Sequence, residues 1–231
     1  MRSKLAAALV AGLFSLVAPA AAQDAVPAAP VAVPAVTPEN ILNLDLSTGG
    51  RVVIQLRPDV APQHVTRIKA LARQGFYNGV LFHRVIEGFM AQTGDPTGTG
   101  SGGSPLPDLK SEFNGLPHVR GVVSAARADD PNSANSQFFI VFSPRFTLDG
   151  KYSVFGRVIS GMQYVDAIER GEPPAAPSRI VKASIGSDNL PSPTPQEVAA
   201  AMARQPAPVV QAQAPAPTPA PSERPQPATQ Q

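Results

Sequence analysis

The stretch Phe82-His-Arg-Val-Ile-Glu-Gly-Phe-Met-Ala-Gln-Thr-Gly-Asp95 combines a cation with apolar side chains and ends at a glycine-rich loop. Its alternation predicts two short strands that meet at Glu87-Gly88 and place Arg84 with other alternate residues on one face of a sheet. A guanidinium beside aromatic and thioether groups suits a mostly apolar ligand with one hydrogen-bond acceptor. A phosphate would instead call for several cations or a helix N-terminus. We therefore expect a pocket that holds a proline.

The N-terminus has the pattern of a cleavable signal peptide over residues 1–22. Arg2 and Lys4 are basic, an apolar run follows over 5–17, and the small residues 20–22 precede a predicted cleavage at Gln23. The apolar run is too short for a comfortable membrane span. We expect an exported protein in a bacterial periplasm, with full secretion as the alternative.

Proline is over-used, with 27 in 231 residues, and many of these lie near the two ends of the chain. Segments 23–38 and 191–231 are rich in proline and alanine and lack apolar periodicity. This composition predicts an Ala/Pro-rich linker and a disordered Pro/Ala/Gln-rich tail. Residues 39–190 remain as the folded unit, and about 150 residues is a normal size for one domain.

The charge balance argues against several classes of partner. Two of the 19 Lys and Arg residues lie in the predicted signal peptide, so the mature chain is close to neutral against its 17 Asp and Glu. The charges are interspersed, and we expect no nucleic-acid binding and no stable membrane insertion. The chain has no cysteine, which excludes disulfide bonds and thiolate chemistry.

Many short apolar runs between turn residues predict a mainly β protein. A helix is expected to begin at Pro62 and end at Gly75, and a second to end at Gly171. Strands are expected over 42–46, 52–56, 80–85, 89–93, 121–126, 137–142, 151–158 and 180–185. Together these elements predict an antiparallel barrel with helices over its open ends.

Other chemical motifs fail on their context. The glycines of 98–103 match a dinucleotide fingerprint in spelling, but the prolines of 105–107 cannot open the helix that it requires. His64, His83 and His118 contain no closely spaced ligand pair, so we expect no metal and no cofactor. Lone His83 is more simply a packed, hydrogen-bonded residue than a general base. No Gly-x-Ser-x-Gly is present for a serine hydrolase.

Two further stretches complete the pattern. They are Gly121-Val-Val-Ser-Ala-Ala-Arg-Ala-Asp-Asp-Pro-Asn-Ser-Ala-Asn-Ser-Gln-Phe-Phe-Ile140 and Leu148-Asp-Gly-Lys-Tyr-Ser-Val-Phe-Gly156. With the first stretch, they make the chain resemble the cyclophilins, which are peptidyl-prolyl cis–trans isomerases, over essentially all of 40–186. The resemblance implies a closed eight-stranded antiparallel β-barrel capped by two α-helices.

The resemblance also implies roles for individual residues. Arg84 would be the catalytic arginine, and Phe89, Gln92 and Phe139 would join it in the catalytic set. The implied substrate-binding residues are His83, Met90, Gly100, Ala126, Arg127, Gln137, Leu148 and Tyr152.

The chain departs from the family pattern at three positions. Thr147 stands where the family has a pocket-edge tryptophan, Tyr152 replaces a histidine, and Arg127 replaces an asparagine. A clamp made through the backbone should survive the change at Arg127. Loss of the tryptophan predicts weak or no cyclosporin binding without a loss of catalysis.

The leading hypothesis is an exported isomerase, expected to be a monomer, that acts on proline-containing peptides and unfolded exported proteins. One alternative is a non-catalytic proline-binding or chaperone module, against which Arg84, Gln92 and Phe139 argue. A second treats the tail as a tether or adaptor that carries the barrel. The tail prolines could also visit the chain's own pocket, but the modest effective concentration of a disordered tail disfavours this.

Overall fold

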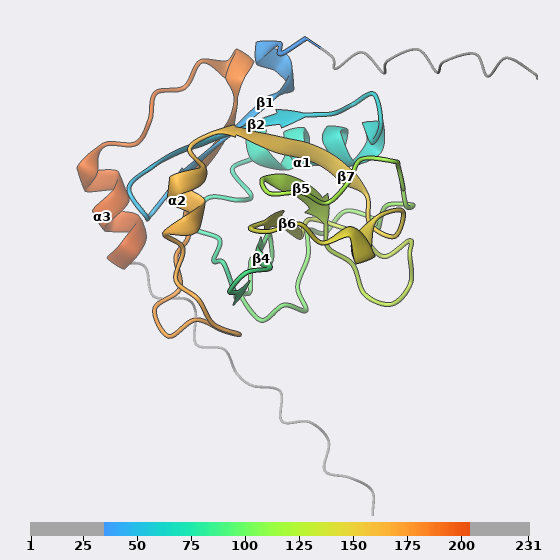
Figure 1. Cartoon of the computed structure of the whole chain (residues 1–231). Coiled ribbons are helices and arrows are strands. Elements are labelled where there is room, and N and C mark those ends of the chain that lie inside the picture. The colour runs from blue at the N-terminus through green and yellow to red at the C-terminus, as the bar shows by residue number, and fades with distance from the viewer. Residues whose placement is uncertain (1–34, 204–231) are drawn as a thin grey trace, which may run out of the picture. The chain divides into compact units, whose positions relative to one another are not determined.

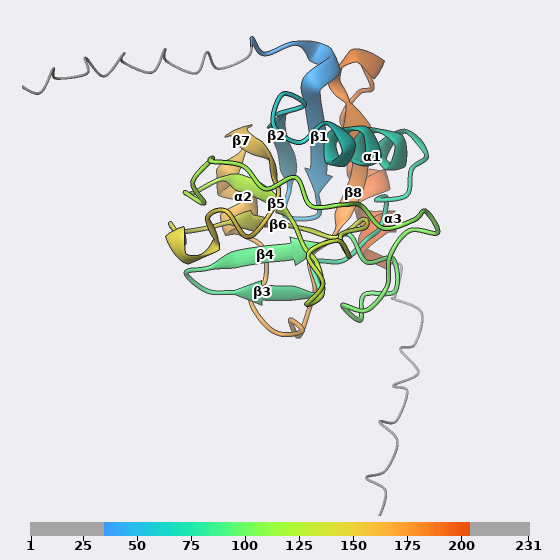
Figure 2. The ribbon, with the colours of Figure 1, turned by 90° about the vertical axis from the view of Figure 1, so that its right-hand side faces the viewer.

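The computed structural model describes residues 35–203, and these form one compact unit built on an eight-stranded antiparallel sheet (Figures 1 and 2). The hydrogen-bonded order is β3-β4-β6-β5-β7-β2-β1-β8. The strands are β1 (Ile41–Leu46), β2 (Gly50–Leu56), β3 (Arg84–Ile86), β4 (Met90–Thr93), β5 (Val122–Ala125), β6 (Phe138–Val141), β7 (Val154–Ser160) and β8 (Ile180–Ile185). The mainly β class and the eight strands agree with the sequence prediction.

The sheet is curled but open, so the expectation of a closed barrel is wrong. Its end strands β3 and β8 are not neighbours in the ladder. The segment before β3 was expected to be strand, but it instead runs past the start of β8. There the Gly79 N–H donates to the Ile180 carbonyl at 2.7 Å, and the Phe82 N–H donates to the Ser178 carbonyl at 2.9 Å. These bonds bridge the opening, while β3 keeps only three residues.

Three α-helices are present among residues 35–203, where two were expected. α1 (Pro62–Arg73) packs against β8, and α2 (Met162–Asp166) packs against β2. Pro62 occupies the first turn of α1, where its missing N–H costs no hydrogen bond. Three short 3-10 helices, η1 (Pro38–Asn40), η2 (Phe146–Leu148) and η3 (Gly186–Asp188), complete the elements.

The third helix, α3 (Pro195–Ala203), falls within the tail that was expected to be disordered. A capping box begins it, in which the Thr194 N–H donates to Glu197 Oε2 at 2.6 Å and the Glu197 N–H donates to Thr194 Oγ1 at 3.3 Å. An alanine-rich run then continues the helix, because alanine has the highest helix propensity. The signal peptide, most of the linker and residues 204–231 lie outside the described part of the chain.

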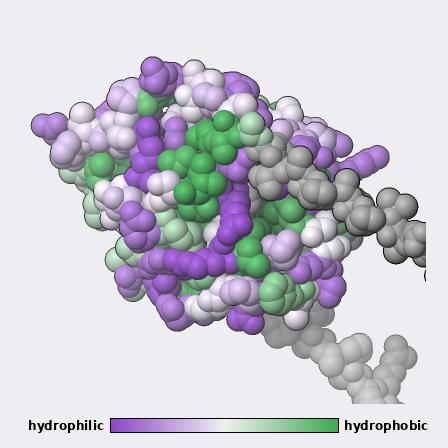
Figure 3. Space-filling model, turned by 45° about the horizontal axis from the view of Figure 1, so that its top comes forward, coloured by the Kyte–Doolittle hydropathy of each residue, from purple (hydrophilic) through white to green (hydrophobic). Residues whose placement is uncertain are grey.

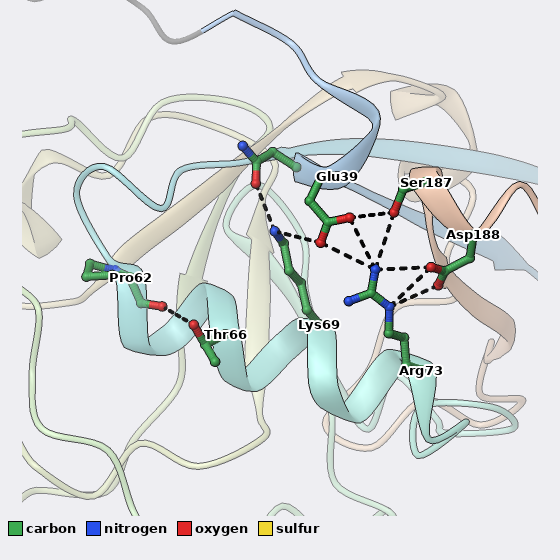
Figure 4. A network of polar contacts seen from close by, with 8 residues as sticks. Glu39, Pro62, Thr66, Lys69, Arg73, Ser187 and Asp188 are labelled. Atoms are coloured by element: carbon green, nitrogen blue, oxygen red, sulfur yellow. Dashed lines mark hydrogen bonds and ion pairs between the residues drawn. The ribbon is translucent and has the colours of Figure 1, made fainter.

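A polar network joins α1 to the segments at both ends of the domain (Figure 4). Arg73 on α1 pairs with Glu39 of η1 at 3.3 Å and with Asp188 of η3 at 3.1 Å. Lys69 reaches Glu39 at 3.4 Å, and Ser187 Oγ donates to Glu39 Oε2 at 2.6 Å. Arg73 and Glu39 are about half-exposed, so their ion pair adds little to the stability of the fold.

Apolar side chains cover both faces of the sheet along β4, β5 and β6. On β6, Phe138 and Ile140 belong to the large cluster inside the curl, whereas Phe139 and Val141 belong to a smaller cluster on the other face. This explains why β6 is an unbroken apolar run without alternation. The large exposed hydrophobic residues are scattered, and on the face drawn in Figure 3 hydrophilic side chains border an apolar patch.

Candidate active site

Three strands place three of the four predicted catalytic residues in one row. Arg84 on β3 lies opposite Gln92 on β4, and Gln92 lies opposite Phe139 on β6. Directly opposite residues of antiparallel strands share a face, so the three side chains stand on the same side of the sheet. Arg84 is half-exposed, with 42% of its side chain accessible. The row therefore presents a cation, an amide and an aromatic ring side by side.

An apolar floor surrounds Phe139. Met90 lies two residues before Gln92 on β4 and is almost fully buried in the same apolar cluster as Phe139. Phe89, Leu148 and Tyr152 pack against this cluster. The Phe139 and Tyr152 rings meet edge to face, with centroids 5.7 Å apart. Such contacts hold rigid aromatic walls where a small apolar ring can bind.

A polar wall stands on the other side of the row. Gln92 Nε2 donates to Gln137 Oε1 at 2.9 Å, and Gln137 Nε2 donates to the carbonyls of Gly100 at 2.9 Å and Gly102 at 2.8 Å. These groups border a cavity of about 580 Å³ that Ala126 and Arg127 also line. The site is thus an apolar floor next to a polar cavity whose amide side chains are oriented by hydrogen bonds.

The twelve predicted site residues all lie in the described part of the chain. Arg84 lies in the row, and His83 lies beneath the glycine-rich loop. The members of the apolar floor are Phe89, Met90, Ala126, Phe139, Leu148 and Tyr152. The members of the cavity wall are Gln92, Gly100, Ala126, Arg127 and Gln137.

Arg127 is engaged along its side chain. Its guanidinium donates to the carbonyls of Ala128 at 2.7 Å and Lys151 at 3.2 Å, and it lies 4.7 Å from the centroid of the Tyr152 ring. The two family departures at Arg127 and Tyr152 therefore contact each other. The Arg127 side chain is held by this contact, and Arg127 itself lines the cavity.

We expect Gln137→Glu to lower kcat/KM by about 10-fold, mainly through a higher KM. The carboxylate would face the two glycine carbonyls that now accept hydrogen bonds from the amide. The lost hydrogen bonds should weaken substrate binding by about 1–2 kcal/mol. Peptide isomerisation assays at several substrate concentrations measure this. Gln163→Glu, the same change on the exposed face of α2, is the control and should leave both constants unaltered. Unaltered kinetics in Gln137→Glu would contradict the role of the wall.

The glycine-rich loop is wrapped around the buried carboxylate of Asp95, which sequence reasoning did not single out. Its two oxygens accept from the N–H groups of Thr97, Thr99, Gly100 and Gly102 at 2.6–3.1 Å. A Cβ on Gly102 would lie 2.1 Å from Asp95 Oδ1, so this position requires glycine. Burial acts to raise the pKa of Asp95, but the hydrogen bonds outweigh it and hold the pKa below its usual value. Hydrogen bonds to one buried carboxylate therefore shape the loop that borders the cavity.

His83 is buried beneath this loop and does not meet the other two histidines. The nearest ring atom of His83 would be 3.5 Å from a Cβ on Gly100, and neither ring nitrogen has a hydrogen-bond partner among the described residues. Burial lowers the pKa of His83, because it disfavours the charged ring. Within residues 35–203, no group of three or more His, Cys, Asp or Glu side chains could hold a metal ion.

A second group that sequence reasoning missed supports Phe139 from below. Asp149 Oδ1 meets His118 Nδ1 at 2.8 Å, and His118 Nε2 meets Ser124 Oγ at 2.9 Å. The order resembles a hydrolytic triad, but Ser124 is fully buried and cannot reach a substrate. The His118 ring stacks on Phe139 with centroids 6.3 Å apart. In the sequence, the lone Ser124 within the apolar strand 121–126 could have indicated a buried polar group here.

The fold and the site together are an open antiparallel sheet with an arginine beside an apolar floor. The model of the family described as "Cyclophilin type peptidyl-prolyl cis-trans isomerase/CLD" matches residues 42–185. A probable peptidyl-prolyl cis-trans isomerase of Brucella suis is 49% identical over 170 residues, which cover 67% of this chain and 86% of that protein. Peptidyl-prolyl cis-trans isomerase B of Bacillus subtilis is 42% identical over 129 residues, covering 55% and 89%.

Solved structures agree with this match. Cyclophilin AquaCyp293 from Hirschia baltica has a TM-score of 0.62 at 33% identity and covers 68% of this chain and 77% of its own. A Cryptosporidium parvum cyclophilin, crystallised in the presence of the dipeptide Ala-Pro, has a TM-score of 0.59 at 30% identity and covers 63% and 98%. The chain belongs to the cyclophilin-type peptidyl-prolyl cis–trans isomerase family, and it is an enzyme of that class.

Proposed function

We propose that the row of Arg84, Gln92 and Phe139 catalyses rotation about X–Pro bonds in exported, unfolded proteins by stabilising the twisted amide. The observation that carries this proposal is the register that sets the three side chains side by side over an apolar floor. The family supplies the reaction. The register of β3, β4 and β6 supports the proposed roles of the three residues.

The reaction needs neither a nucleophile nor a metal, because no bond is made or cut. Its barrier of about 20 kcal/mol comes from the loss of amide resonance. A catalyst must bind the twisted amide more tightly than either planar form. In the twisted state the prolyl nitrogen becomes pyramidal and gains a lone pair, and it can then accept a hydrogen bond.

Arg84 is arranged to donate that hydrogen bond. Its Nε donates to Glu172, and Nη1 and Nη2 have no hydrogen-bond partner among the described residues. The floor of Phe89, Met90 and Phe139 would remove the proline ring and the amide from water, which strengthens the bond to Arg84. Gln92 and the neighbouring backbone would hold the substrate carbonyl.

A folding assay tests the proposal on a protein substrate. The purified protein should accelerate the slow, proline-limited phase of refolding of an unfolded test protein, and it should leave the fast phases unchanged. Acceleration that rises linearly with enzyme concentration supports catalysis. A protein that suppresses aggregation but leaves the slow phase unchanged would favour the alternative, a non-catalytic chaperone module.

The exported setting rests on the N-terminal pattern of residues 1–22. Cell fractionation with N-terminal sequencing tests it, and we expect mature protein in the periplasm that begins at Gln23. Uncleaved protein in the cytosol would overturn this part of the proposal. Within residues 35–203, no helix is long and apolar enough to cross a membrane.

Weak cyclosporin binding is part of the same proposal. Thr147 lies in η2 at the edge of the floor and offers little apolar surface, and its neighbour Phe146 is 63% exposed. A tryptophan at this edge would give a cyclic apolar ligand much more contact area than threonine does. Proline rotation depends instead on the row and the floor.

A further inference from the structure

The loop 170–174 extends the catalytic row by one more residue. Gly171 pairs with Val85 on the free edge of β3, with N–H to carbonyl distances of 2.8 and 2.9 Å in the two directions. This antiparallel bridge places Glu172 opposite Arg84 and on the face that carries Gln92 and Phe139. Arg84 Nε donates to Glu172 Oε2 at 2.7 Å. A carboxylate thus stands beside the guanidinium on its side away from Gln92.

A second ion pair holds the same loop from the other end. Arg170 Nε donates to Glu87 Oε2 at 2.7 Å, and its guanidinium lies 4.2 Å from the centroid of the Phe142 ring. Gly171 has φ of +145°, and a Cβ there would lie 2.5 Å from the Cα of Pro174. The tight turn therefore excludes a side chain at Gly171, and the loop keeps Glu172 beside β3.

The Arg84–Glu172 pair contributes little to the stability of the fold. The two side chains are 42% and 49% exposed, and ion pairs at this exposure contribute about 0–1 kcal/mol. Its geometry matters more. Glu172 engages Nε and leaves the terminal amino groups free, so it would turn them toward the amide. A free arginine side chain samples many rotamers, and fixing it before substrate binds removes that cost from the reaction.

We propose that Glu172 is a positioning residue that holds the Arg84 guanidinium in its catalytic orientation. The inference rests on the proposed role of Arg84. Glu172 does not contact the amide, so its removal should lower kcat more than it raises KM. We expect Glu172→Ala to lower kcat by about 5- to 10-fold. Glu172→Gln keeps one acceptor oxygen and should fall between this variant and the wild type.

The experiment measures kcat and KM for peptide isomerisation in the purified wild-type protein, Glu172→Ala, Glu172→Gln and Glu87→Gln. Glu87→Gln is the matched control, because it breaks the other ion pair of the same loop without touching Arg84. NMR adds a direct readout of the pair. The Arg84 Nε–H proton should exchange with water faster in Glu172→Ala than in the wild type or in Glu87→Gln.

Lower kcat and faster Nε–H exchange in Glu172→Ala alone support the proposal. Unchanged kcat, or a kcat that rises because the carboxylate competes with substrate, overturns it. An equal loss in Glu87→Gln shows a loop-stabilising role and also overturns it. Arg84→Ala distinguishes the proposed role of Glu172 from the proposed role of Arg84. If Arg84→Ala is inactive and Glu172→Ala is fully active, this inference alone fails; if Arg84→Ala is active, the proposed mechanism fails.

Discussion

Arg84→Ala is expected to lower kcat/KM for X–Pro isomerisation by about 100- to 1,000-fold. The alanine removes the donor that meets the prolyl nitrogen when the amide twists, and loss of one such preorganised donor costs about 3–4 kcal/mol in other enzymes. The ground-state amide offers no lone pair to this donor, so the loss should fall on kcat. Peptide isomerisation under steady-state conditions, with kcat and KM separated, measures the effect.

Two controls keep this result interpretable. Arg84 is half-exposed, so its removal should change the free energy of unfolding by less than about 1 kcal/mol in a urea titration. Arg84→Lys keeps the charge and loses the planar fork, and it should recover only part of the activity. A folded Arg84→Ala variant that retains activity within about threefold of the wild type would contradict the assignment.

Asp95→Ala should destabilise the domain by about 3–5 kcal/mol. The substitution leaves the buried N–H groups of the glycine-rich loop without their common acceptor, and breaking a buried charged network has costs of this size. The loss of the loop should also remove the acceptors of Gln137 and raise KM. Urea unfolding at pH 7 measures the stability, and Asp129→Ala, which removes an exposed carboxylate, provides the control.

The same variant should change the pH dependence of stability. Hydrogen bonds hold the pKa of Asp95 below its usual value in the folded state, so its contribution to stability is present above the unfolded pKa and is lost as the pH falls through the folded pKa. The stability difference between the wild type and Asp95→Ala should therefore narrow below about pH 4. A difference that stays constant from pH 7 to the acid transition would contradict the hydrogen-bonded carboxylate.

Local pattern predicted much of the fold. The strands expected over 42–46 and 52–56 are present as the hairpin of β1 and β2, with Leu44 opposite Val52, because alternation and a tight turn fix a register locally. The prediction of a closed barrel was wrong. Whether β3 pairs with β8 depends on how far the sheet curls, which local pattern does not determine. The α3 helix was missed because proline content outweighed the capping box at Thr194, a signal that the sequence does contain.

The candidate site divides in the same way. Arg84 and Gln92 lie within one short stretch, so the alternation of two strands could place them on one face. Glu172 lies 88 residues from Arg84, and only the pairing of Gly171 with Val85 brings it there. The support of Phe139 by His118 depends likewise on contacts between distant segments. Contacts of this kind depend on how distant segments pair in the folded sheet, so the hydrophobic periodicity of a single sequence does not predict them.

The most direct test of the central claim is NMR exchange between the cis and trans forms of a short X–Pro peptide. Catalytic amounts of the purified protein should broaden the cis and trans peptide signals or give exchange cross-peaks between them, without changing the two populations. Arg84→Ala at the same concentration should leave the exchange near its spontaneous rate. If the wild-type protein shifts the peptide signals by binding but does not accelerate exchange, the pocket is a recognition site and the catalytic account is wrong.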